Sequence, residues 1–294
     1  MSKVEILSLY DEVTATVTYV AFDPATRDAV IIDSVLDYDP AASKLDTKML
    51  EKTYELVRAN NLKVHWILET HAHADHLTGS QWLKEKFPSA KSAIGERITE
   101  VQSVFKKIYN LPEHFIPDGR QFDKLLKDEE VLSAGSLTIR SIATPGHTPA
   151  CLSYQIGDAV FTGDALFMPD TGTGRCDFPK GSSSDLYHSI KKLYALPDSM
   201  RVFVGHDYKA NNTREARWET TIGESKKLNH QLSASTDEES YRKLRDTRDA
   251  TLSAPRLLLP SIQINIDAGK MPEPEENGGH YLKIPIRGAE KFKQ

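Results

Sequence analysis

The chain has 294 residues, of which 39% are hydrophobic and 27% charged, with a formal net charge of −5 and a pI of about 6.1. This acidic balance gives no electrostatic basis for binding nucleic acid or an anionic membrane, and no apolar run approaches the roughly 20 residues that span a bilayer. Two cysteines, Cys151 and Cys176, are too few for a disulfide framework, so we expect a cytoplasmic protein.

The first 110 residues alternate between predicted strands and predicted helices. Alternating or continuous apolar residues predict strands at 14–20, 28–35 and 64–68. Apolar residues at helical spacing predict helices at 46–60, 80–87 and 95–110. Asp46 lies at the start of the first of these helices, and we expect its side chain to cap it.

The pattern changes after residue 129. Residues 129–142, 151–156 and 159–163 predict successive strands joined by short turns, which favours antiparallel pairing. A helix is predicted at 184–195, a strand at 201–205, and charge-rich helices at 213–229 and 236–252. Together these elements predict an α/β fold in which two sheets form a sandwich flanked by helices, followed by a helical C-terminal part.

The stretch 69-ETHAHADHLTGS-80 crowds three histidines and an aspartate into six positions, directly after the strand predicted at 64–68. These residues are His71, His73, Asp75 and His76. Imidazoles buried this close together cannot all carry a proton, because like charges in a buried loop repel strongly. A bound cation resolves the conflict by holding the imidazoles neutral, so the cluster predicts a metal site.

Three further ligand-type residues follow the ends of other predicted strands. His147 lies in TPGHTPA, Asp164 in TGDALF and His206 in GHDY, and a glycine directly precedes each of the three. Glycine has no Cβ, so it permits a sharp turn where backbone approaches another group. Ligands placed at several strand ends can converge on one edge of a sheet, and we expect these three to join the loop cluster there.

The ligand types limit the chemistry without deciding it. Imidazole and carboxylate without thiolate suit zinc, iron(II) or manganese, and the absence of cysteine argues against a closed structural zinc site. Seven candidate ligands exceed the demand of one ion. Two metals sharing Asp164 would activate water for hydrolysis. One metal held by two histidines and one carboxylate would instead leave positions open for a substrate and dioxygen on iron(II).

The motif set resembles that of the metallo-β-lactamase superfamily: H-x-H-x-D-H after a strand, a distant histidine, a GD-containing strand end and a late GHD. The resemblance covers roughly residues 1–230. It implies an αββα sandwich with the metal at one edge, in a catalytic domain spanning 1–230. Residues 231–294 are expected to form a C-terminal extension packed on the same domain.

Within that superfamily the chain resembles most closely the persulfide dioxygenases of the ethylmalonic-encephalopathy-protein type. THAHADHLTGS, TPGHTPACLSY, FTGDALF, TGRCDF and VGHDY carry the resemblance, and the tail is similar to that of a longer bacterial branch. It implies one ferrous ion per chain, held by His71, His147 and Asp164. His73, Asp75, His76 and His206 are then residues that support the ligands, or remnants of a second metal site.

The reaction that the resemblance implies converts glutathione persulfide, dioxygen and water into sulfite and glutathione, a step in sulfide detoxification. Because glutathione carries two carboxylates, cations are expected near the metal. The candidates for substrate binding are Arg175, Tyr208, Lys209, Arg214 and Arg217. A second hypothesis pairs Arg175 with Asp207, so that Asp207 gives structural support to the loop that carries His206.

Two alternatives remain open from the sequence. A thioester hydrolase of the glyoxalase II kind has the same fold, uses two metals and also binds glutathione. A sulfur-sensing binding protein with a degenerate site is disfavoured, because the ligand set is intact. The expected partners are glutathione persulfide and O2, with no nucleic acid and no membrane. The exposed C-terminal helices favour a homo-oligomer, either a dimer or a tetramer.

Overall fold

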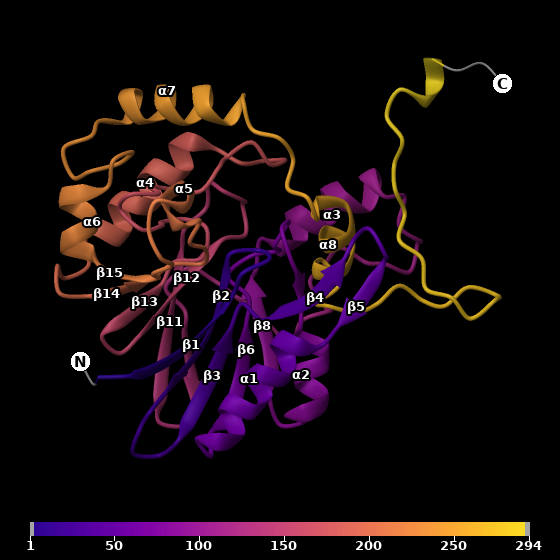
Figure 1. The fold of residues 1–294 in the computed structure, drawn as a ribbon, viewed down its shortest axis with the longest axis horizontal. Helices are drawn as coiled ribbons and strands as arrows, with labels where there is room; N and C mark the ends of the chain where they lie inside the picture. Colours follow the sequence, from indigo (N-terminus) through magenta and orange to yellow (C-terminus); the bar gives the residue numbers. More distant parts are fainter. Residues whose placement is uncertain (1–2, 292–294) are drawn as a thin grey trace.

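A computed structural model describes residues 3–291 and contains two six-stranded sheets that face each other (Figure 1). The first sheet contains, in spatial order, β1 (Glu5–Asp11), β2 (Thr16–Phe22), β3 (Asp28–Ile32), β6 (Lys63–Leu68), β8 (Lys91–Gly95) and β9 (Lys124–Leu126). The second contains β10 (Val131–Ala134), β11 (Leu137–Ala143), β12 (Leu152–Ile156), β13 (Ala159–Phe161), β14 (Arg201–Phe203) and β15 (Glu219–Thr221). A small third sheet is formed by β5 (Lys44–Asp46), β4 (Val35–Asp39) and β7 (Leu77–Thr78).

Strand direction changes within each large sheet. Strands β1 to β3 pair antiparallel, while β3, β6, β8 and β9 pair parallel, with helices in the connections. Strands β10 to β13 pair antiparallel, as the sequence predicted, and β13 pairs parallel with β14. Short turns join β10 to β11 and β12 to β13, whereas the longer loop 144–151, which carries His147, joins β11 to β12. The parallel β6 and β14 both lead directly into loops that carry the predicted metal ligands.

Helices cover the outer faces of both sheets (Figure 1). Those in the first half of the chain are α1 (Lys48–Ala59), α2 (Ser80–Lys86) and α3 (Ile98–Ile108). Those in the second half are α4 (Ser183–Tyr194), α5 (Lys209–Asn212), α6 (Ile222–Leu228), α7 (Glu238–Asp249) and α8 (Leu258–Asn265), with a 3-10 turn at Ala289–Lys291. The order of layers is therefore helix, sheet, sheet, helix, which confirms the predicted αββα sandwich of the metallo-β-lactamase type.

Three apolar layers hold this arrangement together. Between the sheets, Tyr19 packs against Phe161 and Phe203 with ring centroids 5.2 and 5.6 Å apart. Outside the first sheet, Leu50 of α1 packs in one cluster with strand residues of β2, β3 and β6. Outside the second sheet, Leu186 of α4 does the same with residues of β13 and β14. Burial of these apolar side chains on both faces explains why the strands read as nearly continuous hydrophobic runs.

Two predictions of local structure were wrong. Asp46 does not cap α1: its carboxylate accepts from the Thr47 N–H, and Asp37 of β4 accepts from the Met49 N–H instead. The predicted helix 213–229 begins only at Ile222, because residues 219–221 pair with β14 as an edge strand. Thr221 then caps α6 by accepting from the Glu224 N–H.

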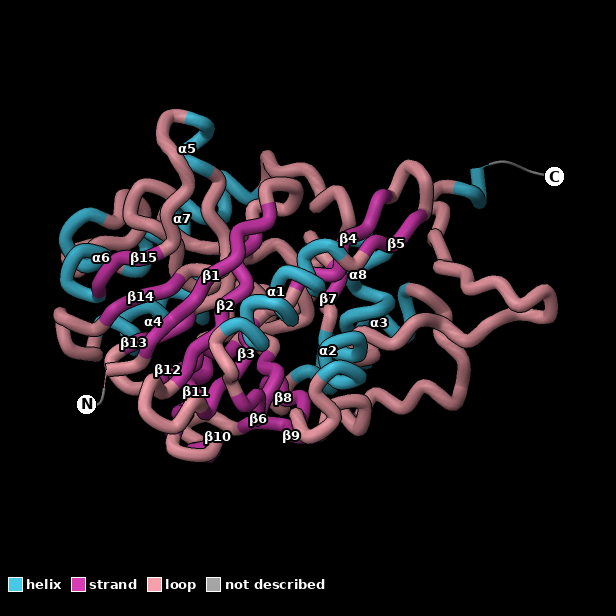
Figure 2. Tube along the Cα trace, turned by 60° about the horizontal axis from the view of Figure 1, so that its bottom comes forward, coloured by secondary structure: helices cyan, strands magenta, loops and turns pink. Residues whose placement is uncertain are grey.

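The segment after residue 250 crosses from the second sheet to the side of the first, forms α8 beside α3, and continues as an arm that extends from the body (Figure 2). Placing the domain boundary at residue 230 stays a prediction, as do the oligomeric state and the cytoplasmic location. Among residues 3–291, no helix combines the length and the apolar character needed to cross a membrane.

Candidate metal centre

The histidine-rich loop begins directly after β6, at the edge where both large sheets end. His71 is buried there, and its Nε2 lies 4.0 Å from Oδ2 of Asp164, which follows β13. His147, in the loop between β11 and β12, places its Nε2 3.5 Å from the same oxygen. One ligand atom from each of the three lies within 4.8 Å of the others, so this His71, His147 and Asp164 group could hold one metal ion.

A second group forms on the other side of Asp164. Nε2 of His206 lies 3.3 Å from Oδ1 of Asp164 and 3.0 Å from Oδ2 of Asp75. His73, Asp75, His76 and His206 also offer ligand atoms within 4.8 Å of one another. Asp164 therefore turns one carboxylate oxygen to each group, as a bridging ligand does. The structure brings all seven predicted residues together.

Unpartnered buried atoms provide the test of whether a metal fits. In the described part of the chain, His71 Nε2, His73 Nδ1, His76 Nε2, His206 Nε2 and Asp164 Oδ1 are buried without a hydrogen-bond partner. Leaving such a group unpaired costs about 1–3 kcal/mol each. Five such atoms in one cluster are explained by a cation that accepts their lone pairs. The donor set therefore fits a metal ion, with imidazole and carboxylate ligands suited to iron, zinc or manganese.

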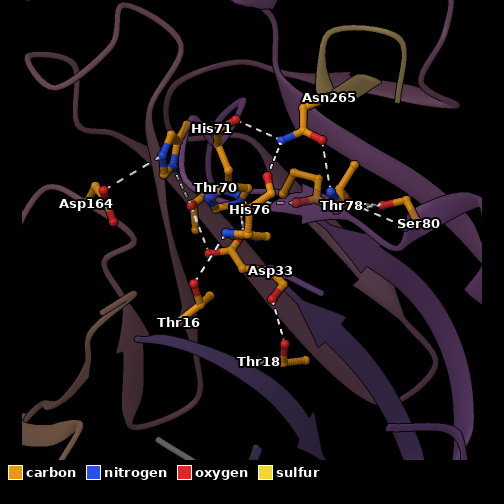
Figure 3. Close-up of polar contacts among 12 residues, drawn as sticks. Thr16, Thr18, Asp33, Thr70, His71, His76, Thr78, Ser80, Asp164 and Asn265 are labelled. Atoms are coloured by element: carbon orange, nitrogen blue, oxygen red, sulfur yellow. Dashed lines mark hydrogen bonds and ion pairs between the residues drawn. The ribbon is translucent and has the colours of Figure 1, made fainter. Parts of the chain in front are cut away.

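The remaining nitrogen of each imidazole has its own partner, which fixes the ring. Nδ1 of His71 lies 3.0 Å from Oγ1 of Thr70, and Nδ1 of His147 lies 2.7 Å from the Arg175 carbonyl oxygen. Thr16 Oγ1, on β2, is 3.3 Å from Nδ1 of His76 (Figure 3). It is also 3.3 Å from Nδ1 of His206. Partners of this kind orient metal-binding histidines and raise their basicity.

His73 is held by two carboxylates from the first sheet. Its Nε2 lies 3.1 Å from Oδ1 of Asp33, which follows β3, and 3.2 Å from Oε2 of Glu69, which follows β6. Glu69 is itself fixed by the hydroxyls of Thr78 and Ser80. Asp33, Glu69 and His73 are close enough together to hold a metal ion themselves. We interpret them instead as a hydrogen-bonded support that orients His73 Nδ1 toward the other ligands, because both carboxylates contact His73 Nε2.

The protonation of two of the clustered histidines, His71 and His76, suits metal binding. Burial, then the neighbouring His73, holds the pKa of His71 well below its usual value. Burial likewise lowers the pKa of His76. Both imidazoles are therefore neutral near pH 7 and can donate a lone pair to a cation.

Two of the glycines singled out in the sequence are required by close packing. Gly163 has φ +48°, and a Cβ there would lie 2.5 Å from Thr70 Oγ1, the atom that contacts His71. A Cβ on Gly205 would lie 3.0 Å from Asp164 Oδ1. Any side chain at these positions would displace a ligand or its support.

A cavity of about 280 Å³ opens over the centre. Its walls include His147, Asp164, Arg175, Phe178 and Tyr208. The Tyr208 ring stacks on that of His206 at 5.7 Å, and the Phe178 ring meets that of His147 edge-on at 5.0 Å. Tyr208 and Arg175, two of the predicted substrate-binding residues, therefore line the same cavity as the ligands His147 and Asp164, and their contact with a substrate stays a prediction.

The predicted pair between Arg175 and Asp207 was wrong. The Arg175 guanidinium donates two hydrogen bonds of 2.6 Å to Asp177, two residues along the same turn. Asp207 is fully buried and accepts from both Nη atoms of Arg214, at 2.7 and 2.8 Å. Arg214 reaches Asp207 because the chain turns back after β14. Asp207 still supports the loop of His206, but with a different cation.

The other predicted substrate cations are committed elsewhere. Arg214 also binds Asp170 through two hydrogen bonds, and Arg217 donates to Asp170 as well. Neither arginine lines the cavity over the centre. Lys209 pairs with Glu12 at 2.8 Å. Arg214, Arg217 and Lys209 therefore form ion pairs with carboxylates of the protein, and their role in substrate binding stays a prediction.

The C-terminal segment supports the centre through residues that the sequence did not single out. Asn265, at the end of α8, donates to the His73 and His76 carbonyl oxygens and accepts from the Thr78 N–H, each at 2.8 Å (Figure 3). On α7, the buried Arg245 pairs with Asp249, which accepts from the Cys176 N–H beside Arg175. A buried polar position on an apolar helix, such as Asn265, was the available signal.

A family model described as the metallo-beta-lactamase superfamily matches residues 11–206, most of the sandwich and all seven clustered residues. The chain belongs to this superfamily. The histidine and aspartate cluster is the metal-binding cluster typical of the superfamily.

Similar proteins carry more than one functional name. "Glyoxylase B2" of Dictyostelium discoideum is 49% identical over 274 residues, 93% of this chain and 94% of that protein. "Persulfide dioxygenase ETHE1, mitochondrial" of Homo sapiens is 30% identical over 233 residues, 78% of this chain and 76% of that protein. A crystal structure of ETHE1 from Myxococcus xanthus superposes on this protein with a TM-score of 0.71 at 30% identity. The superposition covers 90% of the present chain and 100% of the Myxococcus xanthus chain.

Proposed function

We propose that this protein is an iron-dependent persulfide dioxygenase that converts glutathione persulfide, O2 and water into sulfite and glutathione. The observation that carries the proposal is the group formed by His71, His147 and Asp164, of which His147 and Asp164 line an open cavity. Two histidines and one carboxylate on one side of an ion, with the other side open, suit iron(II) that must admit both a substrate and dioxygen. The similarity of this chain to the human persulfide dioxygenase and to ETHE1 of Myxococcus xanthus supports the same function.

In this proposal the three residues would hold one ferrous ion, which would supply the redox chemistry with O2 that side chains lack. The chain's own residues position the metal ligands and shield the reacting sulfur. The Arg175 carbonyl and Thr70 hydroxyl fix the rings of His147 and His71. The Phe178 and Tyr208 rings wall the cavity and exclude water from the reacting sulfur.

The test is oxygen uptake by anaerobically iron-loaded protein on addition of glutathione persulfide, with sulfite assayed in the same vessel. We expect about one sulfite for each O2 consumed. Protein that demonstrably holds iron but consumes no oxygen would contradict the proposal.

A binuclear glutathione thioester hydrolase is the second candidate, and a specific observation favours it. His73, Asp75, His76 and His206 form a complete second group with buried unpartnered nitrogens, which a single-metal enzyme does not need. The 49% identity to a protein named "Glyoxylase B2" supports the same candidate. Protein loaded with two metals that hydrolyses a glutathione thioester, without oxygen uptake, would establish it.

The variant Thr16→Val separates the two candidates. It removes the hydroxyl between His76 and His206 while keeping the side-chain shape, so affinity for a second metal should fall about 10- to 100-fold. Because the described hydrogen bonds of the Thr16 side chain reach none of the first group's residues, we expect one iron per chain and oxygen uptake within about twofold of wild type. Metal analysis and oxygen electrode traces measure both.

Thr53→Val is the matched control, since Thr53 is equally buried but bonds only to the Met49 carbonyl on α1. If Thr16→Val lost oxygen uptake in parallel with the second metal, while Thr53→Val did not, the reaction would depend on both groups and the single-iron proposal would be wrong.

A further inference from the structure

The peptide bond between Arg175 and Cys176 is held at both of its polar groups. Its carbonyl oxygen lies 2.7 Å from Nδ1 of His147, and its N–H donates to Oδ2 of Asp249, also at 2.7 Å. This peptide bond is trans, so its N–H and C=O point in opposite directions. The bridging peptide, as we call this unit, therefore connects a metal-type histidine to a carboxylate on α7.

The contact with the bridging peptide decides which nitrogen of His147 is free to bind a metal. A carbonyl oxygen can only accept, so Nδ1 must carry the proton, and Nε2 of the neutral ring keeps its lone pair. Nε2 is the atom that lies 3.5 Å from Oδ2 of Asp164. A stronger acceptor at Nδ1 orients the ring more firmly and raises the basicity of Nε2. A group that strengthens the Arg175 carbonyl as an acceptor therefore acts on the metal ligand.

A buried arginine holds Asp249 beside the bridging peptide. Oδ1 of Asp249 accepts from Nε and Nη2 of Arg245 at 3.0 and 2.6 Å, which leaves Oδ2 for the Cys176 N–H. Both side chains are buried, although α7 lies on the outside of the second sheet next to α4 (Figure 1). Arg245 also donates to the Thr173 carbonyl oxygen at 3.1 Å. The carboxylate and the bridging peptide are thus fixed relative to each other by contacts besides their own hydrogen bond.

We propose that Asp249 is a positioning residue for the metal and acts on His147 through the bridging peptide. A hydrogen bond to a carboxylate is about twice as strong as one between neutral groups, and bonds that share a peptide polarise each other. The charge of Asp249 thus makes the Arg175 carbonyl oxygen a stronger acceptor for His147. Asp249 lies beyond residues 11–206, which match the family model, and its role is the same for either candidate reaction.

The test compares wild type with Asp249→Asn, which keeps the shape of the side chain but removes its charge. We expect the affinity for the first ferrous ion, measured anaerobically by competition with a chelator, to fall about 10-fold. In zinc-loaded protein, used as a diamagnetic probe, the NMR signal of the His147 Nδ1 proton should move upfield and exchange faster with water. A loss of stability alone would not move that signal.

Tyr241→Phe is the matched control. Tyr241 is also buried on α7, and its hydroxyl contacts the same loop through Oγ1 of Thr173 at 2.8 Å, without reaching the bridging peptide. This variant should keep the wild-type affinity for ferrous ion and the wild-type His147 proton signal. Equal losses in Tyr241→Phe and Asp249→Asn would show that any loosening of the loop is sufficient, and the proposal would be overturned.

A second variant covers the stability of the first, because Asp249→Asn leaves the buried charge of Arg245 without its partner. The double variant with Arg245→Gln and Asp249→Asn removes both charges, and it should show the same loss of affinity and the same movement of the proton signal. Wild-type affinity and an unmoved signal in the double variant would overturn the proposal. Both readouts concern metal binding, so they are independent of whether the loaded protein consumes oxygen with glutathione persulfide.

Discussion

Replacing Asp164 by Asn is expected to reduce bound iron to less than about a tenth of wild type and activity by at least about 100-fold. The substitution keeps the shape of the side chain but removes the negative charge that faces His71, His147 and His206 at 4.0, 3.5 and 3.3 Å. Because Asp164 turns one oxygen to each ligand group, the first group loses its only carboxylate and the second keeps only that of Asp75. Metal analysis after loading and desalting, followed by the oxygen uptake assay, measures both effects.

The matched control is Asp246→Asn on α7, whose side chain is exposed and forms no ion pair or hydrogen bond with the described residues. It should retain wild-type iron and activity. Full iron content in Asp164→Asn would show that the metal is held elsewhere, and the assignment of the centre would then be wrong.

Replacing Asn265 by Ala is expected to lower the free energy of unfolding by about 2–4 kcal/mol, at about 1 kcal/mol for each of three lost hydrogen bonds. The His73 and His76 carbonyl oxygens and the Thr78 N–H lose their buried partner together. Since the loop that carries four ligand-type residues is then held less firmly, iron affinity should fall about 10-fold or more. Chemical denaturation and metal titration provide the two measurements.

Gln263→Ala is the informative comparison, because Gln263 lies on the same helix but bonds to the Lys283 backbone instead of the metal loop. It should affect stability without changing iron affinity. Equal iron affinities in the two variants would show that α8 does not position the loop.

The clustering of metal-type residues could be predicted from the sequence because its signals are local. His71 to His76 lie in one loop, and His147, Asp164 and His206 each follow an apolar strand, so their meeting at one sheet edge needs only the rule that strand ends lie together. The two-sheet sandwich flanked by helices followed from the strand and helix periodicities, and the αββα assignment followed from the resemblance to the metallo-β-lactamase superfamily. The residues that orient the ligands could not be found this way. Thr16 contacts His206 across 190 positions, and nothing near either residue indicates that contact.

The errors have a common physical cause. Arg175 and Asp207 are each followed by a competing partner within seven residues, Asp177 and Arg214, and the local pairs form in place of the distant one. Residues 219–221 directly precede a helix but form the edge strand of a sheet. Their pairing with β14 satisfies backbone N–H and C=O groups of β14 that would be left unpaired if the helix began earlier. In both cases a competing partner replaced the predicted one: a nearby charged residue in the first case and strand β14 in the second.

The bonds from Asn265 to the metal loop have a consequence for the order of events during synthesis. All seven ligand-type residues have been translated once His206 has been added to the chain. Three backbone groups between His73 and Thr78 gain their hydrogen-bond partner, the Asn265 side chain, only after α8 has been translated. A nascent chain that lacks α8 therefore presents the histidines on a loosely held loop. We therefore expect tight metal binding only after α8 has emerged from the ribosome and Asn265 has bonded to the loop.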